Sequence, residues 1–149
     1  MEGQEGITVR IAQRSDYQFE NTFGAGVPVL MTDEPAPLGA GSGPSPVQLL
    51  SAAVGNCLAA SLLFALRKFK QDPRGIACDV TASVGRNEDK RLRVSSIAVQ
   101  LRLGAPGQEI EHLDRVLATF EDYCTVTASV RAAIPVSVAV SDSAGVRLK

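Results

Sequence analysis

The sequence predicts an α+β fold in which antiparallel strands surround one central, apolar helix, in the order βββ-α-ββ-α-β. Three observations predict it: a long uncharged segment in mid-chain, alternating apolar and polar residues on both sides of it, and a later segment with helical periodicity. At 149 residues the chain has the size of one domain, and we expect residues 1–149 to form a single domain.

The central helix is predicted between Gly43 and Lys70. Ser45 can cap its start, and Pro46 suits the first helical position because the N–H that proline lacks would have no partner there. Residues 47–66 include no charged side chain, and apolar residues occupy nearly every side of the helix. A helix that is apolar all round must be enclosed. We therefore expect a buried helix.

Alternating residues predict a meander of three strands before this helix. The strands are expected near residues 7–11, 17–23 and 27–32, with a turn at 14–16. Residues 33–45 are rich in Pro, Gly and Ser and predict a loop that leads to the helix.

Three further strands and a second helix are predicted after the central helix. Residues 76–84 and 97–103 alternate and are joined by a polar hairpin loop at 85–91, and a last strand starts at Pro135. An apolar stripe predicts the second helix, and continuing the stripe by four residues reaches Cys124. The stripe consists of Ile110, Leu113, Leu117 and Phe120.

A second copy of the chain is expected to cover the central helix. Two helices and one sheet face do not enclose a helix that is apolar on every side. Closed two-fold pairs are the commonest oligomers. We therefore predict a tightly joined homodimer.

Charge and composition exclude several classes of function. The net charge of −1 and the pI near 5.8 give no electrostatic footprint for nucleic acid or an anionic membrane. The start of the chain is acidic and polar, unlike a signal peptide. The apolar run at residues 49–66 only reaches the lower limit of a membrane span, so a core helix is the preferred interpretation. We expect a cytoplasmic protein that binds neither nucleic acid nor membrane.

Cys57 and Cys124 are the candidate catalytic residues, because both fall on inward-facing stripes. If the fold brings them together, one thiolate can attack a peroxide to form a sulfenic acid, and the other thiol can condense with it to a disulfide. The alternative is that both are ordinary core residues, as Cys78 is expected to be. The cysteine spacings and His112 on a charged helix face make a zinc site improbable, and no cofactor is expected.

An ionised Cys57 requires stabilisation from outside its own helix. It lies mid-helix, where the start of that helix contributes little, and no Lys, Arg or His occurs in the helix before Arg67. Arg10 and Arg14, on the first strand and its turn, are candidates to supply the cation.

Two cysteine motifs resemble those of the OsmC/Ohr family of thiol-dependent hydroperoxide reductases, and the order of elements agrees with that family. The motifs are Gly43-Pro44-Ser45-Pro46 leading to Asn56-Cys57, and Tyr123-Cys124-Thr125-Val126-Thr127. The resemblance implies an intertwined homodimer with active sites at the subunit interface. It also implies that Cys57 attacks the peroxide, that Cys124 resolves the sulfenic acid, and that a dithiol or a lipoylated protein is the reductant.

The chain departs from this family at two positions. Val47 stands where the family's hydroperoxidases carry a glutamate that orients an arginine, and Thr125 stands where many members carry proline. The first hypothesis is an antioxidant enzyme that reduces alkyl or fatty hydroperoxides. The second is a non-catalytic dimer that binds a small apolar or thiol-reactive molecule in the interface pocket. The third is a thiol-based sensor.

Overall fold

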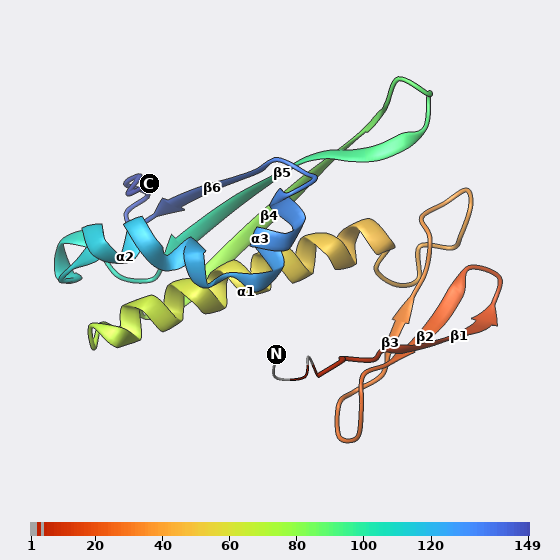
Figure 1. Cartoon of the computed structure of the whole chain (residues 1–149), viewed down its shortest axis with the longest axis horizontal. Coiled ribbons are helices and arrows are strands. Elements are labelled where there is room, and N and C mark those ends of the chain that lie inside the picture. The colour runs from red at the N-terminus through yellow and green to blue at the C-terminus, as the bar shows by residue number, and fades with distance from the viewer. Residues whose placement is uncertain (1–2, 4) are drawn as a thin grey trace. The chain divides into compact units, whose positions relative to one another are not determined.

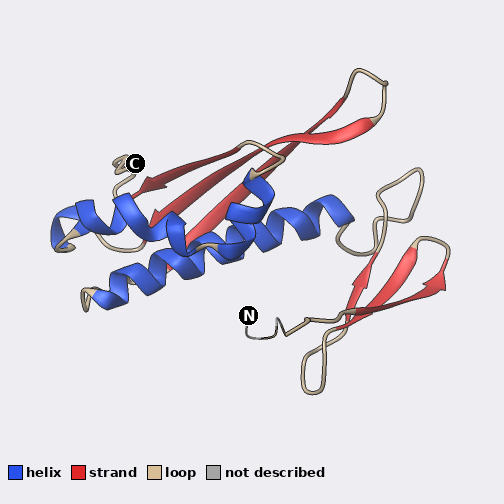
Figure 2. Cartoon of the chain, viewed as in Figure 1, coloured by secondary structure: helices blue, strands red, loops and turns tan. Residues whose placement is uncertain are grey.

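The computed structural model describes residue 3 and residues 5–149 and divides the chain into two compact units, Met1–Leu49 and Leu50–Lys149. Helices and strands are mixed, and each of two sheets has three strands (Figures 1 and 2). The α+β class is therefore confirmed. A single domain over residues 1–149 stays a prediction, as does the homodimer.

The first unit holds an antiparallel meander, as predicted, but its first strand lies further along the chain. The strand includes Arg14 and Ser15, the first two residues of the predicted turn, and the turn itself falls at Asp16, whose φ is 51°. The alternation at residues 7–11 predicts a half-buried strand, and this is wrong for the single chain, because all six residues of the observed strand are exposed. The strands, in the order β1-β2-β3, are β1 (Arg10–Ser15), β2 (Gln18–Thr22) and β3 (Leu30–Thr32).

The loop before the central helix is organised by one buried carboxylate. Asp33 accepts hydrogen bonds from the amides of Glu34, Ala40 and Ser42 and from the Ser42 hydroxyl. At the end of the loop, Ser45 Oγ accepts from the Gln48 amide at 3.3 Å, and Gln48 Oε1 accepts from the Ser45 amide at 2.9 Å. This reciprocal pair is a capping box, which fixes the start of the helix.

The central helix α1 (Pro46–Lys68) is 23 residues long and has the predicted position. By length and composition it could cross a membrane, a test that the core helix of a soluble protein also passes. Burial on every side is wrong for the single chain, because the chain covers one side only and leaves Phe64 52% exposed on the other. The buried residues are Val54, Gly55, Leu58, Ser61, Leu62, Ala65 and Leu66.

The second unit packs α1 against a sheet of order β4-β5-β6, which comprises β4 (Ile76–Arg86), β5 (Leu92–Leu103) and β6 (Val136–Ser141). The β4 and β5 strands form the predicted antiparallel hairpin. The expectation of antiparallel strands throughout is wrong, because β6 pairs with β5 in parallel. A long helical connection between these two strands returns the chain to the same end of the sheet, as a parallel pair requires.

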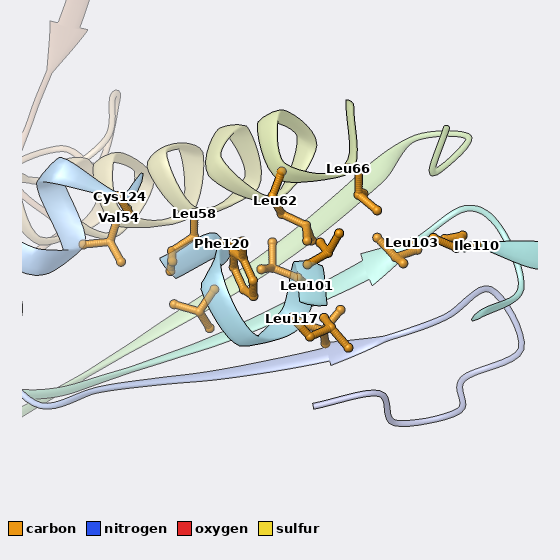
Figure 3. Packing of buried hydrophobic residues seen from close by; sticks show 14 of the residues in the cluster. Val54, Leu58, Leu62, Leu66, Leu101, Leu103, Ile110, Leu117, Phe120 and Cys124 are labelled. Carbon is orange, nitrogen blue, oxygen red and sulfur yellow. The ribbon is translucent and has the colours of Figure 1, made fainter. Parts of the chain in front are cut away.

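The core lies between α1, the sheet and the later helices. Figure 3 shows Leu58 and Leu62 of α1 in one cluster with Leu101 and Phe120, and all four are fully buried. Close approach of α1 to β4 requires Gly55, because a Cβ there would lie 2.6 Å from Val80 Cγ2.

The predicted second helix is several short helices instead of one. Its stripe is confirmed in burial, since Ile110, Leu117 and Phe120 are buried. The helix breaks at Cys124, whose φ of −91° and ψ of 92° are extended, so a new helix starts directly after it. The segments are a 3₁₀ turn at Gly107–Glu109, α2 (Leu113–Thr119), a 3₁₀ turn at Phe120–Tyr123 and α3 (Thr125–Arg131).

Candidate active site

Cys57 lies on the flank of the buried side of α1 and is half-buried, whereas Cys124 is 0% exposed. The fold brings the two thiols within hydrogen-bonding reach of each other, so that the Cys124 thiol can donate to an ionised Cys57 sulfur. Both are free thiols. The two sulfurs are thus neighbours although 67 residues separate them in the sequence (124 − 57).

The start of α3 points its backbone N–H groups at the Cys57 sulfur. The amides of Thr125, Val126 and Thr127 all donate to it. The first N–H groups of a helix have no partner within the helix and are available to an acceptor. The extended backbone of Cys124 therefore has two effects, since it places its own thiol and starts the helix whose amides surround the other sulfur.

These contacts set the two thiols apart in acidity. Burial raises the pKa of Cys57, but the hydrogen bonds from Cys124 and the α3 amides outweigh burial and leave this pKa below its ordinary value. Burial raises the pKa of Cys124, and the adjacent Cys57 raises it further. Cys57 is therefore the thiol that ionises first, and Cys124 keeps its proton.

The two predicted arginines lie in the first unit, on β1. Arg14 binds Glu20 of β2 through two hydrogen bonds, Nε to Oε2 at 3.0 Å and Nη2 to Oε1 at 2.8 Å. The hydrogen bond and charge of Glu20 raise the pKa of Arg14 above its ordinary value. Arg10 is exposed and pairs in register with Thr22. Participation of either arginine in the site stays a prediction.

Cys78 lies on β4, on the strand face that packs against the core. Burial raises its pKa, and the neighbouring Asp79 raises it further. Among the described residues, no group of three or more His, Cys, Asp or Glu side chains is arranged to hold a metal ion.

A groove of about 660 Å³ opens beside α1 in the second unit. Its lining includes the apolar side chains of Ala59, Ala60 and Leu63 and the charged side chain of Arg67. Asn56 lines the groove, but the adjacent Cys57 does not. The groove therefore runs along the helix that carries the thiol and is not itself the thiol site.

Sequence reasoning missed the amide donors of α3. The expectation that Cys57 needs a cation considered only charged side chains and the start of its own helix. The signal that could have found these donors is the change after Cys124, where a run of Thr, Val and Ala residues without charge begins a new helix.

Comparison with known proteins identifies the family. Residues 39–139, more than half of the chain, match the family described as OsmC-like protein. A search of the curated proteins finds no match.

Solved structures share the fold at low identity. The OsmC like protein from Mycoplasma pneumoniae has a TM-score of 0.78 at 14% identity, with 95% of this chain and 99% of that chain covered. An organic hydroperoxide resistance protein from Elizabethkingia anophelis has a TM-score of 0.72 at 18% identity, with coverages of 95% and 99%. An organic hydroperoxide resistance protein OsmC from Legionella pneumophila has a TM-score of 0.67 at 18% identity, with coverages of 94% and 99%. With the match over residues 39–139, the shared fold leads to one assignment: the chain belongs to the OsmC-like protein family.

Proposed function

We propose that the protein reduces organic hydroperoxides with two cysteines, Cys57 as the attacking thiolate and Cys124 as the resolving thiol. The observation that carries the proposal is the set of donors on the Cys57 sulfur, a thiol and three backbone amides that together lower its pKa. An attacking sulfur must be ionised, and a resolving thiol must be within reach of it.

The reaction takes place in three steps. The Cys57 thiolate attacks one oxygen of the O–O bond and becomes a sulfenic acid, while the other oxygen takes a proton and leaves as the alcohol. The Cys124 sulfur then attacks the Cys57 sulfur, and its proton leaves with the hydroxyl group as water. A dithiol or a lipoylated protein reduces the resulting disulfide by thiol exchange.

Organic hydroperoxides are the proposed substrate class because the surroundings of α1 are apolar. Cys57 packs against the apolar core cluster, and apolar surroundings of the reacting sulfur favour alkyl or fatty hydroperoxides over hydrogen peroxide. The relatives from E. anophelis and L. pneumophila are described as organic hydroperoxide resistance proteins. Exposed apolar surface on α1, including Phe64, supports a homodimer in which a second chain covers this helix.

Arg10 or Arg14 is proposed to stabilise the thiolate further. In the family's hydroperoxidases a glutamate on the central helix orients the arginine, and here Val47 occupies that position. Glu20 already holds the Arg14 guanidinium in a bidentate pair. A planar guanidinium held at two points keeps a fixed orientation, so Glu20 is the proposed substitute anchor.

Consumption of cumene hydroperoxide in the presence of a dithiol tests the proposal. We expect Cys57→Ser to abolish turnover. Without the dithiol and with one equivalent of peroxide, Cys124→Ser should consume the peroxide and leave Cys57 as a sulfenic acid, because no resolving thiol is present. Cys78→Ser is the matched control and should keep the parent rate. A Cys57→Ser protein that consumes the peroxide as fast as the parent would refute the assignment.

The second candidate is a non-catalytic dimer that binds a small apolar or thiol-reactive molecule. Its support is the groove together with Val47 in place of the family's glutamate. Intact mass after mild peroxide treatment separates the two candidates. A loss of two hydrogens that joins Cys57 to Cys124 supports the reductase, and unmodified thiols support the binding protein.

A further inference from the structure

Thr127 presents a buried hydroxyl that contacts the resolving thiol. The side chain lies three residues after Cys124, in the first turn of α3, and is 0% exposed. In the folded chain the Cys124 thiol donates a hydrogen bond to Thr127 Oγ1, with 2.9 Å between the sulfur and the oxygen. A buried hydroxyl without a partner would be destabilising, so the thiol and the hydroxyl depend on each other.

The three polar groups form a chain from Thr127 through Cys124 to Cys57. When Cys57 ionises, the Cys124 thiol turns its only hydrogen from Thr127 Oγ1 to the Cys57 sulfur. A threonine hydroxyl can rotate to donate or accept. While Cys57 is ionised, the Thr127 hydroxyl is therefore the donor to the Cys124 sulfur.

The same hydroxyl becomes more important after Cys57 has been oxidised. Cys124 must then lose its proton to attack the Cys57 sulfur, and its burial opposes the thiolate. Thr127 is the side chain whose hydrogen bond lowers the pKa of Cys124, against the larger opposing effects of burial and of Cys57. A hydroxyl that donates to a buried thiolate stabilises it more than it stabilises the neutral thiol.

We propose that Thr127 is a positioning residue for the resolving step, whose hydroxyl orients the Cys124 sulfur and stabilises its thiolate as it attacks the Cys57 sulfur. The proposal rests on the proposed function for its biological meaning. Its chemistry can also be measured without a peroxide, because the same attack opens a mixed disulfide on Cys57.

The test uses 2,2′-dithiodipyridine with the full-length protein in a Cys78→Ser background. The Cys57 thiolate attacks one reagent sulfur, releases one pyridine-2-thione and forms a mixed disulfide. The Cys124 thiolate then attacks the Cys57 sulfur and releases the second thione, and the two thiol protons leave with the two thiones. Stopped-flow absorbance resolves the two releases.

Thr127→Val removes the hydroxyl and keeps the shape of the side chain. We expect the ratio of the second to the first release rate to fall on the order of tenfold, as for loss of a hydrogen bond to a charged group. The pH profile of the second release should move to higher pH. Thr127→Ser, which keeps the hydroxyl, should stay within about threefold of the parent, a loss smaller than that of a whole charged hydrogen bond. Thr119→Val, which loses a hydroxyl bonded to the Arg115 carbonyl instead, is the matched control.

Two results would overturn the role of Thr127: a Thr127→Val protein with the parent ratio, or a Thr127→Ser protein as slow as the valine variant. A parent protein that releases no second thione would overturn it too. Failure of the proposed function has a different signature, because the parent would then release both thiones but would not consume cumene hydroperoxide.

Discussion

Removing the thiol of Cys124 should make Cys57 less ionised at neutral pH. When Cys57 is ionised, the Cys124 S–H donates to the Cys57 sulfur and helps to lower its pKa. Cys124→Ala deletes this donor and leaves the three α3 amides in place. The pKa of Cys57 should therefore rise, because its thiolate loses one hydrogen-bond donor.

The size of the effect follows from the strength of one charged hydrogen bond. Such bonds contribute about 1.5–3 kcal/mol, and a thiol is a weak donor, so the lower value of about 1.5 kcal/mol applies. Since 1.36 kcal/mol corresponds to a factor of ten, the thiolate fraction should fall about tenfold at a pH below the pKa. Cys124→Ser keeps a donor and should reduce the fraction less.

Alkylation of Cys57 by iodoacetamide as a function of pH measures this thiolate fraction. The proteins are compared in a Cys78→Ser background, and peptide mass spectrometry isolates the label on Cys57. We expect the pH profile of alkylation to move to higher pH in Cys124→Ala, with a rate about tenfold lower on its acid limb. An unchanged or faster rate would refute the inference that Cys124 stabilises the thiolate, because the two sulfurs would then not share a proton.

Three further changes test the stability of the fold. Leu62→Ala removes a fully buried side chain and should lower the free energy of unfolding by about 3 kcal/mol in denaturant titrations. Ser45→Ala breaks the capping box of α1 and should lower it by about 1 kcal/mol in the same assay. Burial raises the pKa of Glu121, but Lys149 and Arg131 outweigh burial and lower it. Glu121→Gln should therefore lower the free energy of unfolding by about 1 kcal/mol at pH 7. This difference should disappear as the pH falls through the pKa of the glutamate in the folded protein. Thermal melts at several pH values measure it.

The α+β class and most strands follow from local patterns, because alternation and helical periodicity record which face of each segment is apolar. The Ser45 cap at the start of α1 could also be predicted, since Ser45 and the helix that it caps are neighbours in the sequence. The parallel pairing of β6 could not, because strand direction depends on the path of the chain after Phe120. The break at Cys124 was missed because the apolar stripe continues through it, and periodicity alone does not detect an extended residue.

The two cysteines of the candidate site could be selected from the sequence, but the backbone amides that lower the pKa of Cys57 could not. Cys57 and Cys124 fall on apolar stripes, which is why both were candidates. The amides that surround Cys57 belong to the backbone. Because nearly every residue type has a backbone N–H, the sequence does not indicate which amides lie near the sulfur. Only the three-dimensional path of the chain at Cys124 reveals that a helix from elsewhere in the fold begins at the sulfur.

Backbone donors also explain how a chain without the family's glutamate can retain an ionised cysteine. An arginine needs an anchor, for which Glu20 is the proposed substitute, whereas the amides need only that α3 begins at Thr125. Thr125→Pro tests how much the amides at the start of α3 contribute to the stability of the Cys57 thiolate. Proline is favoured at the first helical position, and the extended Cys124 backbone is compatible with a following proline, so α3 should persist and stability should not fall. The change removes one N–H donor, and Cys57 alkylation should slow about fivefold at a pH below the pKa of Cys57, as for one hydrogen bond of about 1 kcal/mol. An unchanged alkylation rate with α3 intact would mean that the amides do not stabilise the thiolate, and the arginines would then have to supply that stabilisation.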